Sequence, residues 1–148
     1  MTAPLYELEP WEADDSRGFV VRRVADGQRL RWQTLPKRGG LESFNVAGTS
    51  HRLDALQDPS FAPGKPLSLI PEPSNPYDPN AIGVWNDQGT LQVGYLPREY
   101  AAKLAPRLGT GPKLAAMAIW ETLADSHRVG LRVLIVHERA SLRGVSFA

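Results

Sequence analysis

The stretch EPSNPYDPNAIG, residues 72–83, carries three prolines around an aromatic–acidic pair, Tyr77 and Asp78. Proline fixes φ at about −65° and disfavours helical geometry in the residue before it, so this backbone has few options. An asparagine such as Asn75 can also close a turn onto neighbouring amides. The stretch therefore predicts a rigid turn between two strands, which presents a ring and a carboxylate at little entropic cost.

Strand and helix signals lie on both sides of this turn. Residues 66–71 are predicted to form a strand bounded by prolines, and 81–85 and 91–96 to form a hairpin around Asn-Asp-Gln-Gly. Pro97 suits the first turn of a helix, where its missing amide hydrogen costs nothing. The apolar residues that follow recur at helical spacing, and Pro106 should end or kink the helix.

The rest of the chain is predicted to form further short elements. Residues 1–16 look irregular, with Tyr6 and Trp11 as points of attachment. Asp-Gly between two β-prone runs is a strong hairpin signal. A polar loop with one helical turn near 53–57 is expected over 49–65. The additional strands are expected at 18–24 and 29–32 (the hairpin), 43–48, 114–122 and 129–137.

This pattern of elements predicts the fold class. Many short strands, turn signals and one clear helix indicate a mainly β protein with one or two helices (α+β), in the form of a small barrel. The sequence PKRGG at 36–40 interrupts the strand pattern. We therefore expect an N-terminal extension with a β-hairpin over 1–40, a compact domain over 41–139 and a C-terminal tail over 140–148.

Composition narrows the class of protein. The chain has 148 residues and a formal net charge of +1. It has no cysteine, so disulfides and thiolate metal sites are excluded. Its first residues are acidic and lack the apolar core of a secretory signal. No apolar run approaches the roughly 18–20 residues that a membrane helix needs. We expect a soluble, cytoplasmic protein without a membrane partner.

Charge is distributed unevenly along the chain. Residues 1–16 carry five acids and no Lys or Arg, whereas 17–38 carry seven basic residues and one acid. Residues 98–143 carry eight basic residues and four acids. A local excess of this size can bind phosphate, although charged faces are usually just solvated.

Catalytic and metal-binding patterns do not stand out. The histidines His51, His127 and His137 lack the spacing of metal ligands, and Ser50 with His51 lacks the sharp turn of a serine nucleophile. We expect no enzyme, no cofactor and no metal. Cations and aromatic rings, the ingredients of a nucleic-acid site, recur in Tyr77, Tyr95, Tyr100, Arg98, Lys103 and Arg107.

Three segments in this order resemble the HIRAN domain: FNVAGTSH at 44–51, LSLIPEPSNPYDPNAI at 67–82 and VGYLPRE at 93–99. The resemblance covers residues 43–136. It implies a small, OB-like β-barrel that recognises DNA. In eukaryotic fork-remodelling helicase-like ATPases, such domains capture the free 3′ end of single-stranded DNA.

The resemblance also implies roles for individual residues. Tyr77 would line a pocket for the terminal nucleotide, Asp78 would meet its 3′-hydroxyl, and Asn75 would add a polar contact. Arg98 would take the place of a phosphate-binding lysine, and Tyr95 belongs to the matching VGYLP segment. The eukaryotic form has an Arg and an aromatic residue where this chain has Ser50 and His51. His51 can stack on a base, and Arg52 can supply the phosphate contact.

Three hypotheses follow. The first is a non-catalytic module for single-stranded DNA ends in DNA repair or replication-fork processing, built from Tyr77, Asp78, Asn75, Tyr95, His51, Arg52 and Arg98. The second is a protein-interaction or adaptor domain for a helicase or nuclease, motivated by the N-terminal extension. A third hypothesis, an enzyme acting on nucleic acid, is the weakest, because no metal-ligand or nucleophile pattern supports it. The hairpin of the extension can equally well complete or cover the barrel. The proline-flanked turn can have a purely structural role, and the oligomeric state stays open.

Overall fold

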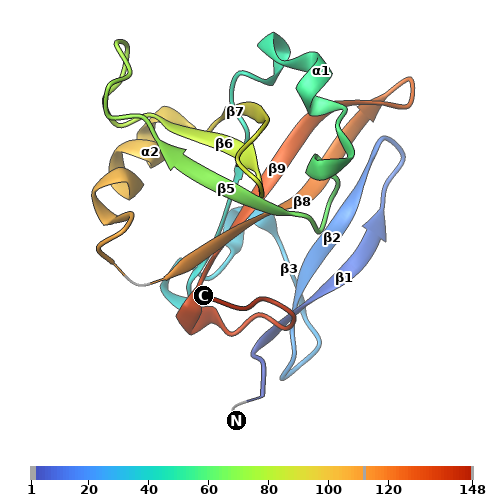
Figure 1. Cartoon of the computed structure of the whole chain (residues 1–148). Coiled ribbons are helices and arrows are strands. Elements are labelled where there is room, and N and C mark those ends of the chain that lie inside the picture. The colour runs from blue at the N-terminus through green and yellow to red at the C-terminus, as the bar shows by residue number, and fades with distance from the viewer. Residues whose placement is uncertain (1–2, 112, 148) are drawn as a thin grey trace.

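The described residues, 3–111 and 113–147 of a computed structural model, form a nine-stranded antiparallel sheet with two short α-helices (Figure 1). The mainly β, α+β prediction is confirmed. The strands are β1 Tyr6–Glu12, β2 Ser16–Arg23, β3 Arg29–Leu30, β4 Leu41–Asn45, β5 Pro66–Pro71, β6 Ile82–Asn86, β7 Gln92–Tyr95, β8 Leu114–Ala124 and β9 His127–His137. The helices are α1 Leu53–Leu56 and α2 Arg98–Leu104.

The long hairpin of β8 and β9 organises the sheet. Its turn, Asp125 and Ser126, has positive φ at both residues (49° and 66°), the geometry that suits a two-residue hairpin. One edge of β8 pairs with β9, and its other edge pairs with β5 near Ala116 and with β2 near Glu121. The strand order β1-β2-β8-β5-β6-β7 results, while β9 carries β4 on its far side.

The pairing does not close into a complete barrel. β4 and β7 lie at the ends of the ladder, and an isolated bridge connects Ala47, just after β4, with Tyr95 of β7. Each residue donates its amide to the other's carbonyl, at 2.8 and 2.9 Å. Gly94 permits this approach, because a Cβ there would collide with the Ala47 carbonyl oxygen. The barrel expected from sequence is thus an open sheet drawn together at one point.

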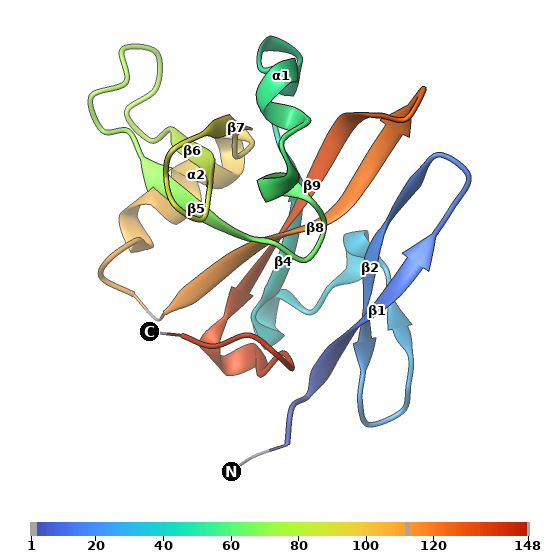
Figure 2. The ribbon, with the colours of Figure 1, turned by 45° about the vertical axis from the view of Figure 1, so that its right-hand side comes forward.

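Two hydrophobic clusters lie on opposite sides of β9. Side chains alternate along a strand, so Leu131, Val133 and Ile135 enter the cluster that β5–β7 and α2 cover. Leu134 and Val136 enter the second cluster, which the N-terminal strands and the C-terminal segment cover. Figure 2 shows the N-terminal hairpin and the β5–β7 layer on either side of β8 and β9. β9 is therefore buried on both faces from Val133 to His137, whereas the tip of the hairpin is exposed.

The irregular structure expected for residues 1–16 is wrong. β1 pairs with β2 over seven positions, from Tyr6↔Arg23 to Glu12↔Arg17. Acids of the first segment lie beside arginines of the second: Glu7 contacts Arg22 and Glu9 contacts Arg29, both at 2.9 Å. These pairs join the acidic and basic regions of the sequence into one surface, so part of the local basic excess is already neutralised.

The attachment of the N-terminal segment differs from the prediction in its details. Tyr6 packs on the second cluster as expected, but Trp11 stays 43% exposed, with the Arg29 guanidinium 4.7 Å from its ring centroid. The hairpin expected around Asp26-Gly27 is short, since β3 contributes only Arg29 and Leu30 to the pairing.

A buried carboxylate connects β2 to the rest of the sheet. Glu121 on β8 is 3% exposed and accepts hydrogen bonds from Arg17 of β2 and Arg128 of β9, each at 2.7 Å. Arg128 also donates to the carbonyls of Leu56 and Asp58 beside α1. Burial raises the pKa of Glu121, but the two guanidiniums outweigh it and hold that pKa below its usual value. This cluster joins β2, the β8–β9 hairpin and the residues around α1.

The region between β5 and β8 agrees closely with the sequence prediction. β5 has the expected bounds, and β6 and β7 form the expected hairpin. α2 follows Pro97 directly and ends at Leu104, and Pro106 lies in the 3-10 turn beyond it. No helix among residues 3–111 and 113–147 is long and apolar enough to cross a membrane.

Candidate nucleic-acid interface

The loop between β5 and β6 is a turn held by its own asparagine. The Oδ1 atom of Asn75 accepts hydrogen bonds from the amides of Tyr77 (2.9 Å) and Asp78 (3.1 Å). Asp78 repeats the device, because its Oδ1 accepts from the Asn80 amide at 2.9 Å. Such turns order a loop without help from regular structure. The prolines and these bonds together fix where Tyr77 and Asp78 lie.

Glu72 fastens this turn to the sheet, and sequence reasoning missed it. Its Oε1 accepts hydrogen bonds from Asn75 Nδ2 (3.0 Å) and from the Tyr95 hydroxyl on β7 (3.1 Å). The spacing of three between Glu72 and Asn75 was visible in the sequence, but the partner Tyr95 is 23 positions away. Since both polar groups of Asn75 are engaged in this network, its observed part is to shape the turn.

A pocket of about 370 Å³ lies beside the turn, and five of the seven predicted site residues line it. The floor consists of small and apolar side chains, of which Ala81, Leu96 and Ala101 are buried. No sequence pattern singles out these floor residues, because alanine is common in any core. The lining residues are Ala47, Asn75, Tyr77, Asp78, Ala81, Tyr95, Leu96, Arg98 and Ala101.

Tyr77 is the most exposed large side chain of the pocket. Its relative exposure is 89%, and it leads among the exposed large hydrophobic residues of the described chain. A single exposed hydrophobic residue is normal on a protein surface, so the exposure of this ring alone indicates no function. Here the exposed ring stands beside a pocket that already contains the second ring, Tyr95.

The charged groups of the pocket are one carboxylate and one guanidinium. Arg98 Nε lies 3.7 Å from Asp78 Oδ2, which is an ion pair but longer than a hydrogen bond. The Asp78 side chain is only 18% exposed, whereas that of Arg98 is 77% exposed. The Oδ1 atom of Asp78 accepts the hydrogen bond from the Asn80 amide, and its Oδ2 atom faces Arg98.

The segment after β4 contributes the remaining two predicted residues. Arg52 has its guanidinium 6.0 Å from the centroid of the Tyr95 ring, but it is not among the residues that line the pocket. His51 is exposed in the adjoining 3-10 turn, Thr49–His51, and is not among the residues that line the pocket. The structure thus places Arg52 near one residue of the pocket, Tyr95, and leaves His51 in the adjoining turn.

The other aromatic and basic candidates lie elsewhere. The Tyr100 ring stacks on Phe44 with centroids 3.7 Å apart, and its hydroxyl donates to Glu42 at 2.6 Å. Burial first, and then that hydrogen bond, raise the pKa of Tyr100 above its usual value. Arg107 lines a different pocket. Within 3–111 and 113–147, no three His, Asp or Glu side chains gather as a metal site would require.

The model of the HIRAN domain matches residues 40–137, well over half of the chain. The chain belongs to the HIRAN family. HIRAN is generally a DNA-binding domain and typically non-catalytic. A comparison with curated proteins finds no match.

Two solved structures are similar to this HIRAN protein. The crystal structure of the HIRAN domain of human HLTF is 23% identical, with a TM-score of 0.48, and the match covers 70% of this chain and 81% of that one. The crystal structure of a protein from Lactobacillus plantarum is 25% identical, with a TM-score of 0.47, over 65% of this chain and 92% of that one.

Proposed function

We propose that the Tyr77 pocket binds the end of single-stranded DNA and selects a free 3′-hydroxyl. The observation that carries the proposal is the combination of an 89% exposed ring, a partly buried carboxylate and a cation around one pocket. Bases that are not paired stack on aromatic side chains, and cations meet the phosphates. Membership of a DNA-binding family supports the same assignment.

Each group has a distinct part in this proposal. Tyr77 stacks on the terminal base, and Tyr95 supports the nucleotide from the wall of the pocket. Asp78 Oδ2 accepts the hydrogen bond of the 3′-hydroxyl, because its other oxygen already bonds Asn80. A carboxylate repels a phosphate, so a 3′-phosphorylated end is disfavoured. Asn75 keeps the turn in shape, and its direct contact with DNA stays a prediction.

Phosphate binding is assigned to two cations, Arg98 and Arg52. Arg98 is 77% exposed and held only loosely by Asp78, so its guanidinium can turn toward a phosphate. Arg52, with its guanidinium 6.0 Å from the Tyr95 ring centroid, presents a second cation. His51, exposed beside Arg52, can stack on the next base along the strand.

Fluorescence anisotropy with a labelled decathymidine tests the proposal. The wild-type protein should bind a 3′-hydroxyl end on the order of tenfold more tightly than a 3′-phosphate end, as expected for a hydrogen bond to a charged group. Asp78→Asn should remove that preference while keeping the bond to Asn80. Equal affinity of the wild-type protein for both ends would refute selection of the 3′-hydroxyl.

The wider setting of this activity belongs to the same proposal. DNA repair or replication-fork processing, a helicase or nuclease partner and a cytoplasmic location remain predictions. A binding module should leave labelled DNA intact in the presence of Mg²⁺ or Mn²⁺, which gel electrophoresis can check. The observed pairing of β2 with β8 favours a structural part for the N-terminal extension rather than an adaptor function.

A further inference from the structure

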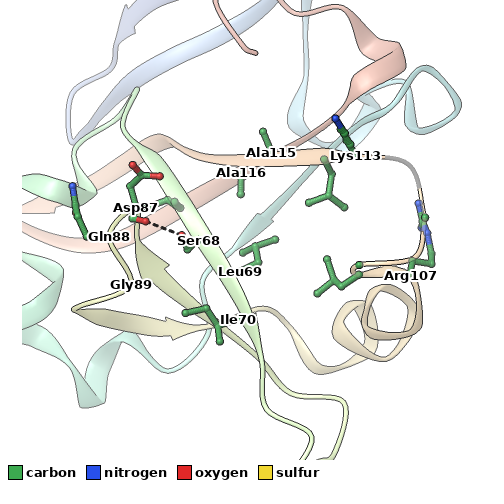
Figure 3. Close-up of a pocket in the computed structure, with 15 residues that line it drawn as sticks. Ser68, Leu69, Ile70, Asp87, Gln88, Gly89, Arg107, Lys113, Ala115 and Ala116 are labelled. Carbon is green, nitrogen blue, oxygen red and sulfur yellow. Dashed lines mark hydrogen bonds between the residues drawn. The ribbon is translucent and has the colours of Figure 1, made fainter. Parts of the chain in front are cut away.

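A second pocket, of about 800 Å³, lies between β5 and the start of β8. It shares no lining residue with the Tyr77 pocket. Figure 3 shows Ser68 and Leu69 of β5 in its middle, with Ala115 and Ala116 of β8 above them. The pocket is a groove formed where two neighbouring strands separate.

Within residues 3–111 and 113–147, the edge of β5 has no strand partner along this groove beyond Leu67. Its pairing with β8 ends at Leu67↔Ala116. The Lys65 carbonyl accepts a hydrogen bond from β8 at 3.0 Å, and the Glu72 amide donates toward the β6 side at 2.8 Å. Because hydrogen-bonding directions alternate along a strand, Leu69 turns its amide and carbonyl toward β8, as Lys65 and Leu67 do.

The start of β8 presents the complementary edge, which likewise has no partner on the β5 side in the described part of the chain. The Lys113 carbonyl accepts from the Glu138 amide at 3.0 Å, on the β9 side. The next residue, Leu114, therefore directs its backbone toward β5. The last observed pair of the two strands is Leu67↔Ala116. If the same register continued, Leu69 and Leu114 would be the next hydrogen-bonded pair, but they are not paired. Unpaired strand edges of this kind are templates for another strand.

The side chains of the groove define what it can hold. Leu69, Leu108 and Leu114 are partly buried against the first hydrophobic cluster and give the groove an apolar floor. Arg107 and Lys113 stand at one end and Asp87 at the other, as Figure 3 shows. Neither cation has an ion-pair partner among the residues that the structure describes.

We propose that this groove binds an extended peptide segment of a partner protein, which pairs with the edge of β5 at Leu69. Alternate apolar side chains of the peptide face the leucine floor, and an acidic residue lies beside Arg107 and Lys113. Added strands gain main-chain hydrogen bonds for affinity and side-chain pockets for specificity. The peptide should pair over about four residues, because it runs alongside Ser68–Pro71 and both strands rise roughly 3.3 Å per residue.

A peptide fits this groove better than a nucleic acid does. None of the described lining residues is aromatic, so unstacked bases find no ring to stack on. Asp87 at the far end repels phosphates, whereas it suits a basic residue of a peptide. The free backbone edges also match the donors and acceptors of a peptide chain.

Selection from a phage-displayed library of random twelve-residue peptides tests the proposal. The full-length protein should enrich peptides with alternating apolar residues next to an acid. Fluorescein-labelled copies of the enriched peptides should bind Arg107→Glu/Lys113→Glu on the order of tenfold more weakly. The matched control, Lys37→Glu/Arg38→Glu, reverses two exposed charges away from the groove and should bind as the wild type does.

Amide hydrogen exchange shows whether the peptide occupies the strand edge. The Leu69 and Leu114 amides should become protected when an enriched peptide binds, and they should stay unprotected with decathymidine. Failure to enrich any peptide over the charge-reversed variant would overturn the proposal. The proposal would also be overturned if Arg107→Glu/Lys113→Glu, but not the control Lys37→Glu/Arg38→Glu, bound decathymidine more weakly than the wild type. That result would assign the groove to nucleic acid. Either result leaves the 3′-end preference of the Tyr77 pocket separately measurable.

Discussion

Tyr77 separates binding from stability more cleanly than any other residue of the pocket. Its side chain is 89% exposed, so Tyr77→Ala should leave the thermal unfolding midpoint unchanged. Loss of the ring should weaken decathymidine binding by about 1–3 kcal/mol, the usual contribution of one base stacked on an aromatic side chain. Anisotropy and thermal melts measure the two effects. Tyr77→Phe keeps the ring and should retain affinity, and an unchanged affinity in Tyr77→Ala would exclude stacking.

Glu121 is the residue on which we expect stability to depend most. Glu121→Gln removes the charge between Arg17 and Arg128, and the buried guanidinium of Arg128 loses its counterion. Breaking such a pair should lower the free energy of unfolding by about 3 kcal/mol. Urea denaturation measures this change. Glu9→Gln, which weakens the more exposed ion pair with Arg29, serves as the control and should have a much smaller effect.

The same carboxylate should make stability depend on pH. The pKa of Glu121 is lower in the folded protein than its usual 4.5, so its contribution is present above that value. As pH falls through the folded pKa, the carboxylate is protonated and the contribution is lost. Unfolding midpoints from pH 7 to pH 3 should therefore decline more steeply for the wild type than for Glu121→Gln. Parallel curves would show that Glu121 has the same pKa in both states.

At the scale of elements, the contact between β7 and the segment after β4 depends on Gly94. Gly94→Ala places a methyl group against the Ala47 carbonyl and the Val46 side chain, which should cost about 2 kcal/mol of stability. It should also weaken DNA binding, because Ala47 and Tyr95 both line the pocket. Chemical denaturation and anisotropy check these effects. Gly130→Ala on β9 is the control, since its added methyl group would meet only ordinary contacts at 3.5 Å.

Sequence reasoning succeeded for elements whose signals are local. Prolines mark both ends of β5, and Pro97 precedes α2, so both were predicted close to their observed bounds. It failed for β1, where Pro10 and the run of acids are poor strand signals. The arginines that neutralise those acids come from β2 and β3, and only the folded sheet brings them together.

The candidate site divides in the same way. The turn of Asn75, Tyr77 and Asp78 was predictable because its bonds run between residues three apart or fewer. The link from Glu72 to Tyr95 and the bridge from Ala47 to Tyr95 connect distant positions, and no sequence pattern announces them. The position of Arg52 against Tyr95 likewise required the fold.

At the scale of the whole molecule, the N-terminal strands cover the second hydrophobic cluster. Val21 is fully buried there beside Ile119 and Leu134, and Tyr6 and Leu8 pack at the edge of the cluster. Deletion of residues 1–30 exposes this apolar surface and should abolish cooperative unfolding or solubility, which circular dichroism and gel filtration measure. Deletion of residues 1–4 should change neither. A stable, DNA-binding fragment would instead support the separate extension expected over 1–40.

The ion pairs of the N-terminal hairpin also reduce the number of cations that are available to neutralise DNA phosphates. Arg22 and Arg29 already have carboxylates as their counterions, so they add little when DNA approaches. For single strands, the logarithm of the binding constant falls by about 0.7 per phosphate neutralised for each unit of the logarithm of salt concentration. Arg98 has only the longer 3.7 Å contact with Asp78, so with Arg52 and Arg98 as the phosphate contacts the slope is about −1.4. Although the chain has 17 Lys and Arg residues, the salt dependence of its DNA binding should correspond to only two phosphate contacts.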